Sequence, residues 1–102
     1  MEFSLYGKPP SSATITSIRL ERREPARNRQ RFYNIAVTRT LFDGWAVVRE
    51  WGRIGQPGTV RETWFETEGA ATKAGEQVRQ RKEKRGYRAA GRYKNTNNNP
   101  AQ

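Results

Sequence analysis

The sequence has no cysteine and no histidine, and these absences exclude several kinds of chemistry. Without cysteine there is no disulfide, thiolate nucleophile or zinc–thiolate centre, and the absence suits a cytoplasmic protein. Without histidine the commonest general base and the commonest metal ligand are missing. No apolar run approaches the roughly 20 residues needed to cross a bilayer, and residues 1–10 lack the features of a secretory signal. We therefore expect a cytoplasmic protein with no metal site and no membrane partner.

The signatures of catalysis are also missing. Asp43 is the only aspartate and lies in the dipeptide Asp43-Gly44, where a role in a turn explains it. The glutamates alternate with arginines or lie in a helical pattern, which is typical of solvated faces rather than of a paired acid and base. No nucleophile elbow, phosphate-binding loop or dinucleotide fingerprint is present. We expect no enzymatic activity, no catalytic residue and no cofactor.

Positive charge is what the sequence has in excess. Its 20 Lys and Arg residues against 10 Asp and Glu residues give a formal net charge of +10. Such a charge repels itself in a compact protein and attracts polyanions, and arginine binds phosphate in a planar, bidentate manner. Nucleic acid is therefore the expected partner. An acidic membrane, an acidic protein, or charge that serves solubility alone are the alternatives.

The length of 102 residues fits one domain, and the 33% content of hydrophobic residues predicts one thin core with disordered ends. Four segments have the alternating pattern of half-buried strands: residues 14–23, 31–42, 45–51 and 59–65. Pro25 and Asn28 mark a polar connection after the first segment. Asp43-Gly44 is a strong hairpin signal, and residues 52–58, with Pro57 and three glycines, are typical of a loop.

After Thr67 the period becomes helical. Small and apolar residues recur on one face of this segment: Ala70, Ala71, Ala74 and Val78. Thr67 fits an N-cap, and Gly86 fits the end of the helix. The pattern predicts an α+β fold with a small antiparallel sheet of about four to five strands and one helix on one face. We expect a flexible N-terminus over 1–13, a domain over 14–88, and a disordered, basic and Asn-rich tail over 89–102.

Tryptophans and arginines interleave in the second half of the expected sheet: Trp45, Arg49, Trp51, Arg53, Arg61 and Trp64. Aromatic faces stack on bases or sugars, and neighbouring arginines bind phosphates. We interpret Trp45 and Trp64 as core residues. Trp51, which adjoins Gly52 and Arg53, fits either the core or a ligand contact.

Two clusters of cations accompany this constellation. Residues 79–94 contain eight cations against Glu83 alone, and five arginines surround the first connection: Arg22, Arg23, Arg27, Arg29 and Arg31. A charge run is usually a solvated face. However, the self-repulsion of so many cations favours a surface that binds a polyanion.

At Trp51-Gly52-Arg53 the sequence resembles the WGR domain family, and the ordered set of further matches makes the resemblance specific. Arg31-Phe32-Tyr33 opens the second strand, and Gly44-Trp45 precedes the motif strand. Ile54, Gly55 and Gly58 follow the motif, and Phe65 ends the return strand. The basic helix end, followed by Gly86-Tyr87, is similar to that of bacterial members. The resemblance covers about residues 18–88.

The resemblance implies a compact antiparallel sheet with one helix against it. In poly(ADP-ribose) polymerases this domain binds DNA ends, contacts the 5′-terminal nucleotide and relays damage to a catalytic domain. By position, Trp51 would pack on a terminal sugar or base, and Arg53 would lie near the terminal phosphate or at an interdomain contact. The helix end from Lys82 to Arg85 would lie near the DNA backbone. The sequence has no zinc finger, regulatory helices or transferase domain, so we expect no ADP-ribosylation.

These observations predict a monomeric, non-catalytic nucleic-acid-binding module that binds DNA rather than RNA, at ends or nicks, and that is nucleoid-associated if bacterial. No recognition helix is apparent, so sequence-specific readout is not expected. The candidate binding residues are Trp51, Gly52, Arg53, Arg49, Arg31, Lys82, Lys84, Arg85, Tyr87 and Arg88. The alternatives are an adaptor for a DNA-processing protein partner, and a module for RNA or single strands.

Overall fold

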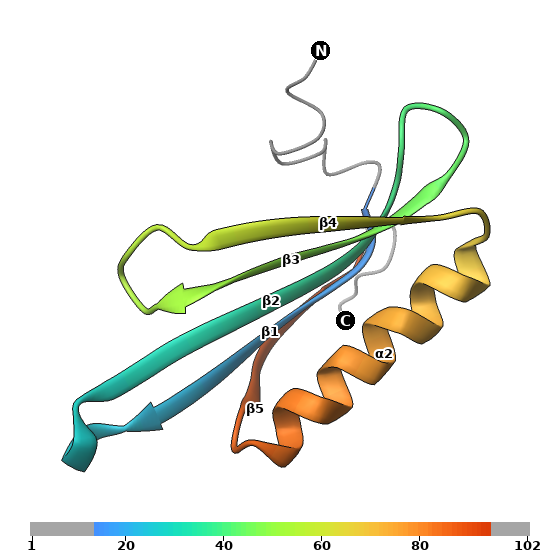
Figure 1. Cartoon of the computed structure of the whole chain (residues 1–102). Coiled ribbons are helices and arrows are strands. Elements are labelled where there is room, and N and C mark those ends of the chain that lie inside the picture. Colours follow the sequence, from blue (N-terminus) through green and yellow to red (C-terminus); the bar gives the residue numbers. More distant parts are fainter. Residues whose placement is uncertain (1–13, 95–102) are drawn as a thin grey trace.

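The computed structural model describes residues 14–94, which form a five-stranded antiparallel sheet with one helix packed on one face (Figure 1). The elements in chain order are β1 (Thr14–Glu24), the 3-10 turn η2 (Pro25–Arg27), β2 (Arg29–Arg39), β3 (Trp45–Arg53), β4 (Thr59–Phe65), α2 (Glu68–Lys84) and β5 (Arg88–Lys94). The strand order is β4-β3-β2-β1-β5, so α2 carries the chain from one edge of the sheet to the other. The predicted α+β fold is confirmed.

The turns form where the sequence places residues that tolerate a left-handed backbone. Asn28 closes η2 with φ 52° and Asp43 lies in the β2–β3 turn with φ 61°, a region that Asn and Asp adopt more easily than other non-glycine residues. The Thr40 hydroxyl holds the second turn by accepting the Gly44 N–H at 2.9 Å. The third turn has Gly55 at φ 91°. These local signals set the register of the hairpins.

The β3–β4 loop is shorter than the sequence indicated. Gly52 and Arg53 belong to β3, where they lie opposite Phe32 and Arg31 of β2. The Ile54 N–H continues the ladder by donating to the Gln30 carbonyl at 2.9 Å. The glycine and proline content predicts the position of the loop. It does not predict this pairing, which depends on the partner strand β2.

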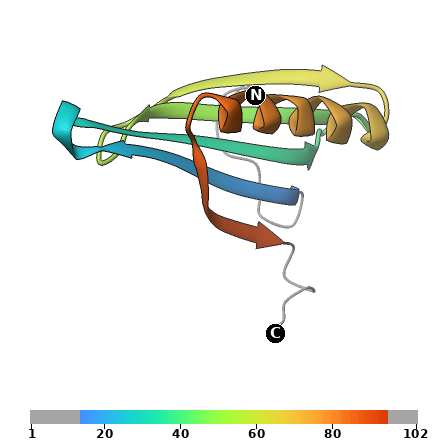
Figure 2. The same cartoon turned by 90° about the horizontal axis from the view of Figure 1, so that it is seen from below.

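Helix α2 begins and ends as the sequence predicts. The Thr67 side chain accepts the Ala70 N–H at 3.1 Å, and Gly86 has φ 101° just beyond the last turn. The buried positions of the helix include Ala71, Gly75 and Val78. Because these residues are small, the helix lies close to the sheet (Figure 2).

The hydrophobic core lies between α2 and the sheet. Its buried members are Leu20, Tyr33, Ile35, Val37, Val47, Ala71, Val78 and Tyr87. Trp45 packs against this core, as predicted, and Trp51 does so from the other end of β3. The core interpretation of Trp64 is wrong, because its side chain is 45% exposed. Trp64 lies opposite Ala46, whereas Phe65 lies opposite Trp45 and shares its face of the sheet.

Strand β5 corrects the expected C-terminal boundary. Residues 89–94 were expected in a disordered tail, but they belong to a strand that pairs antiparallel with β1. The segment RAAGRYK has no clear apolar alternation. Its pairing depends on the free edge of β1, which exists only once the sheet has formed. The expectations for residues 1–13 and 95–102 lie outside the described residues.

None of the helices found in residues 14–94 is long and apolar enough to span a membrane.

Candidate nucleic-acid interface

One end of the sheet extends beyond the C-terminal end of α2. Here the first and third hairpin turns, around residues 25–28 and 54–58, project past the helix (Figures 1 and 2). Side chains alternate between the two faces of a strand, so the residues on the helix side of this projection share a face with the core residue Tyr33. We call this face, with the adjoining end of α2, the basic platform. Its side chains are Arg22, Arg31, Tyr33, Arg49, Trp51, Arg53, Arg61, Lys82 and Tyr87.

Arginines lie directly opposite one another across this platform. Arg31 of β2 is paired in register with Arg22 of β1 on one side and with Arg53 of β3 on the other. Arg49 of β3 is paired in register with Arg61 of β4. Like charges directly opposite each other destabilise a sheet, by roughly 0.2–1 kcal/mol per pair. Placing these arginines opposite one another therefore lowers the stability of the sheet, so a role in folding does not explain their presence.

The acidic side chains offset little of this charge. Arg22 is paired with Glu24 at 3.0 Å, and Arg29 reaches the same carboxylate at 3.5 Å. Within residues 14–94 no carboxylate makes an ion pair with Arg31, Arg49, Arg53 or Arg61.

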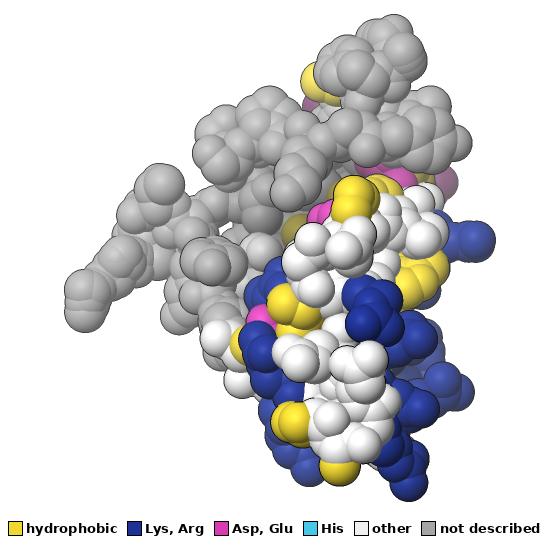
Figure 3. Space-filling view, turned by 90° about the vertical axis from the view of Figure 1, so that its left-hand side faces the viewer, with side chains coloured by type: hydrophobic (Ala, Val, Ile, Leu, Met, Phe, Trp, Pro, Cys, Tyr) yellow, Lys and Arg dark blue, Asp and Glu magenta, His cyan; other side chains and the backbone are white. Residues whose placement is uncertain are grey.

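On the opposite face, by contrast, Arg19 and Arg23 both bind Glu21, at 2.8 and 2.9 Å. Figure 3, which looks at the projecting end, shows much Lys and Arg surface and little acidic surface.

Aromatic rings lie between the two rows of arginines. Tyr33 and Trp51 are directly opposite each other, with ring centroids 5.5 Å apart and planes 12° apart. The Arg49 guanidinium donates to the Tyr33 hydroxyl at 3.3 Å and lies 5.7 Å from the centre of the Trp51 ring. These contacts hold Trp51 half-buried and fixed in orientation. A fixed, partly exposed indole can receive a flat ligand at little entropic cost.

The end of α2 adds cations to this group. The Lys82 amine lies 4.6 Å from the centre of the Tyr33 ring and 5.9 Å from that of Tyr87. Burial lowers the pKa of Lys82, and repulsion from Arg85, Arg81 and Arg49 lowers it further. A Cβ atom placed on Gly86 would lie 3.4 Å from Nε of Arg22. The helix end thus adjoins both rows of arginines.

Most of the predicted binding residues meet on the platform. The structure brings Arg31, Arg49, Trp51, Arg53, Lys82 and Tyr87 together, with Arg85 next to them at the helix end. Gly52 has a packing role, because an added Cβ would lie 3.2 Å from Cα of Gly58.

Lys84 and Arg88 lie apart from this group. Lys84 is two residues beyond Lys82, which places it on the opposite side of the helix, and it is exposed. Arg88 donates to the carbonyl of Tyr87 at 3.0 Å.

Three platform residues were missing from the predicted set: Arg22, Tyr33 and Arg61. A two-residue turn at Asp43-Gly44 would place Tyr33 opposite Ile54, because a hairpin turn fixes the pairing of its strands. The actual connection spans residues 40–44, so Arg39 pairs with Trp45 and Tyr33 lies opposite Trp51. A loop over residues 52–58 does place Arg49 opposite Arg61, so the sequence held the signal for Arg61 but not for Tyr33.

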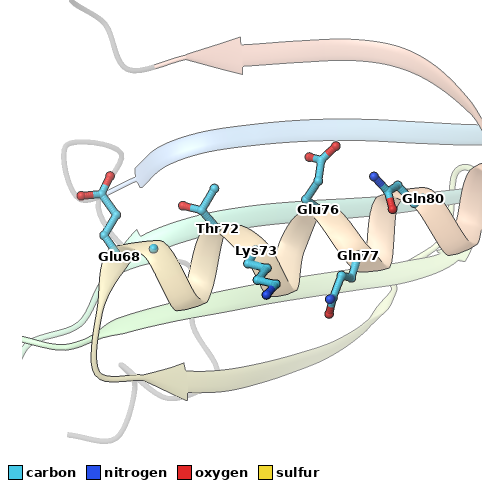
Figure 4. Close-up of a pocket in the computed structure, with 7 residues that line it drawn as sticks. Glu68, Thr72, Lys73, Glu76, Gln77 and Gln80 are labelled. Atoms are coloured by element: carbon cyan, nitrogen blue, oxygen red, sulfur yellow. The ribbon is translucent and has the colours of Figure 1, made fainter.

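A second surface feature, a hollow along the outer side of α2, lies away from the platform (Figure 4). Its lining consists of helix residues that include Glu68, Lys73 and Glu76. In the part of the chain that the structure describes, no group of three or more His, Cys, Asp or Glu residues is placed to hold a metal ion. The platform is the larger concentration of charge and aromatic surface.

The family model of the WGR domain matches residues 16–94, a range that begins within β1 and ends with β5. The chain belongs to the WGR domain family. WGR domains are nucleic-acid-binding modules of poly(ADP-ribose) polymerase-like proteins, and no catalytic family is indicated for this chain.

A curated relative is the uncharacterized protein y4dW of Sinorhizobium fredii (strain NBRC 101917 / NGR234). This WGR domain is 36% identical to it over 69 residues, a match that covers 68% of this chain and 34% of the relative. The chain thus spans about a third of the length of that relative. No solved structure matches the chain.

Proposed function

We propose that this WGR domain is a non-catalytic DNA-binding module that recognises strand ends or nicks through the basic platform. The observation that carries the proposal is the set of like-charged pairs that Arg31 forms in register with Arg22 and Arg53. A bound polyanion would neutralise these arginines and so remove the repulsion that destabilises the sheet. A phosphate backbone laid across β1, β2 and β3 would do so, and each contact would release counterions.

Trp51 supports recognition of an end. Its ring is held by Tyr33 and Arg49 beside the arginines, so it offers one fixed aromatic surface rather than a side chain free to intercalate. Inside a duplex each base is already stacked on its neighbours, whereas a terminal nucleotide exposes a face or a sugar edge. Stacking of a base on an aromatic side chain contributes about 1–3 kcal/mol. The proposed contact is therefore worth most at an end or a nick.

The module acts in this proposal as a monomer in the cytoplasm, associated with DNA rather than RNA. The platform has no helix placed to read base edges, so binding depends on phosphates and on the terminal nucleotide rather than on sequence. Lys84 and Arg88 contribute through long-range charge, because their side chains lie apart from Trp51, and Gly52 contributes through the position of its backbone.

The test is a titration with a 5′-phosphorylated blunt duplex, the same duplex closed by hairpins at both ends, and a single strand, each at several salt concentrations. A Trp64→Phe variant removes the emission of an exposed tryptophan and leaves Trp51 as a clearer reporter. We expect the tightest binding to the open phosphorylated end, with log K falling linearly in log salt by roughly 0.9 per phosphate neutralised.

Equal affinity for open and closed duplexes would reject recognition of ends. Preference for the single strand would favour the single-strand alternative. No saturable binding to any of the three at near-physiological salt would reject nucleic-acid binding and leave the adaptor function.

A further inference from the structure

Lys82 occupies an unusual position on the platform. Its half-buried side chain ends between the rings of Tyr33 and Tyr87, at 4.6 and 5.9 Å from their centres. Tyr33 in turn stacks on Trp51, so the amine contacts the ring that packs against the tryptophan of the proposed nucleotide contact. No carboxylate within residues 14–94 forms an ion pair with this amine. This position therefore favours a role in ligand binding over a role in stabilising the fold.

We propose that Lys82 captures aldehydes at DNA ends, by forming a reversible imine with the open-chain C1′ aldehyde of an abasic deoxyribose held beside Trp51. The inference rests on the proposed function, because the phosphate contacts and Trp51 must first bring the damaged end to the platform. The substrate class is a DNA strand end whose terminal sugar has lost its base.

The surroundings of Lys82 favour the neutral amine that this reaction needs. Burial is the largest cause of its lowered pKa, and the cations of Arg85 and Arg81 on its own helix end and of Arg49 on β3 add to it. The two tyrosine rings attract an ammonium group and act in the other direction. An amine whose pKa is lowered in this way is a better nucleophile near neutral pH.

The reaction balances without any further reagent. The nitrogen lone pair of Lys82 attacks C1′, and the π electrons of the carbonyl move to its oxygen, which takes up a proton. The nitrogen loses a proton to give a neutral carbinolamine. Loss of water then leaves a C=N bond between Nζ and C1′, and hydrolysis reverses the sequence. The abasic sugar presents its aldehyde because no base occupies C1′, and the 5′ phosphate remains free for the arginine rows.

The experiment traps the imine by reduction. The protein is mixed with a duplex that carries a 5′-terminal abasic deoxyribose phosphate, sodium cyanoborohydride is added, and the covalent adduct is measured on a denaturing gel. The matched duplex with a tetrahydrofuran residue has the same shape but no aldehyde. Lys82→Arg retains the charge without a nucleophilic amine, and Lys73→Arg makes the same change at an exposed position on the outer side of α2, away from the platform.

We expect a covalent adduct with wild type and Lys73→Arg, and none above the tetrahydrofuran background with Lys82→Arg. Peptide mapping of the wild-type adduct should locate the modification at Lys82, and this result does not depend on how any variant folds. The initial trapping rate should rise with pH, with a midpoint below 10.5, the ordinary value for lysine.

An adduct that persists in Lys82→Arg, or that maps to another amine, would overturn the inference. Non-covalent binding of the tetrahydrofuran duplex, measured in parallel, separates the two proposals. Binding without an adduct would reject the role of Lys82 and leave DNA binding intact, whereas failure to bind this duplex would reject both.

Discussion

Tyr33 and Trp51 stack face to face across β2 and β3, at a centroid separation of 5.5 Å and an interplanar angle of 12°. The same Tyr33 ring lies 4.6 Å from the Lys82 amine. One core residue therefore fixes both the motif tryptophan and a cation of the helix end. The packing of the core and the arrangement of the platform are consequently not independent of each other.

Trp51→Ala should weaken binding to an open DNA end more than binding to a hairpin-closed duplex. The expected loss at the open end is about 1–3 kcal/mol, the contribution of one stacked base. The readout is a pair of titrations at one salt concentration. Because Trp51 also packs on the core, thermal melting must confirm that the variant is folded at the assay temperature.

Trp64→Ala is the matched control for that variant. It removes the same side chain from a position that is 45% exposed and lies on the face away from α2. It should leave both affinities unchanged. An equal loss of affinity on open and closed duplexes with Trp51→Ala would contradict the role of Trp51 at ends.

Arg31→Gln should raise the stability of the free protein and lower its affinity for DNA. The change removes two like-charged pairs, with Arg22 and with Arg53, and each is worth roughly 0.2–1 kcal/mol. The gain should shrink as salt is added, because salt screens exposed charges. Thermal melting without DNA at low and high salt measures it. A loss of stability at low salt would show that Arg31 supports the fold instead.

Arg85→Ala should flatten the dependence of log K on log salt by about one unit, the effect of losing one phosphate contact. Arg23→Ala is the control, since Arg23 is bonded to Glu21 and Gln30 on the opposite face. Its slope should match that of wild type. A slope unchanged by Arg85→Ala would place the helix end outside the DNA footprint.

Gly75→Ala should stabilise the protein by about 0.5–1 kcal/mol, because glycine in a helix interior is disfavoured relative to alanine by that amount. The new methyl group would lie 3.5 Å from Cγ2 of Val37 and 3.6 Å from Cγ2 of Ile35, which are ordinary van der Waals distances. Denaturant unfolding gives the difference. Destabilisation would mean that α2 must move away from β2 to admit one carbon.

Glu21→Gln should destabilise the protein at neutral pH and have little effect in strong acid. Hydrogen bonds and charge from Arg19, and then from Arg23, lower the pKa of Glu21 below 4.5 despite its partial burial. A lowered pKa in the folded state contributes stability above pH 4.5 that is lost as pH falls through the folded-state pKa. Melting of both proteins from pH 7 to pH 2 should show their difference closing below pH 4.5. A constant difference would assign the effect to packing.

The parts of the fold that depend on local chemistry were predictable from sequence. The cap at Thr67, the stop at Gly86 and the turn at Asp43 each depend on a neighbouring backbone group, and the structure has all three. The alternation that buries Tyr33, Ile35 and Val37 was also predictable, because a strand with one buried face has apolar residues at every second position.

Features that require a partner strand were not predictable in this way. Strand β5 has little apolar alternation of its own and forms on β1, whose sequence lies about 70 residues earlier. Trp64 is exposed because it lies on the face of β4 that points away from α2. A shift of one residue in the pairing of β4 with β3 would exchange the two faces. The arginine rows likewise exist only across strands, so a linear scan found their members but not their juxtaposition.

The pairing of β5 with β1 makes the last described element of the chain complete the sheet beside the first. A chain cut after Tyr87, near the boundary that the sequence suggests, would leave β1 with one row of unpaired backbone amides and carbonyls along its 11 residues. An open edge of that length invites pairing with a second molecule. Strand β5 therefore replaces an open edge of 11 residues with one of 7 residues, and a short edge strand is one of the ways in which natural sheets limit such pairing.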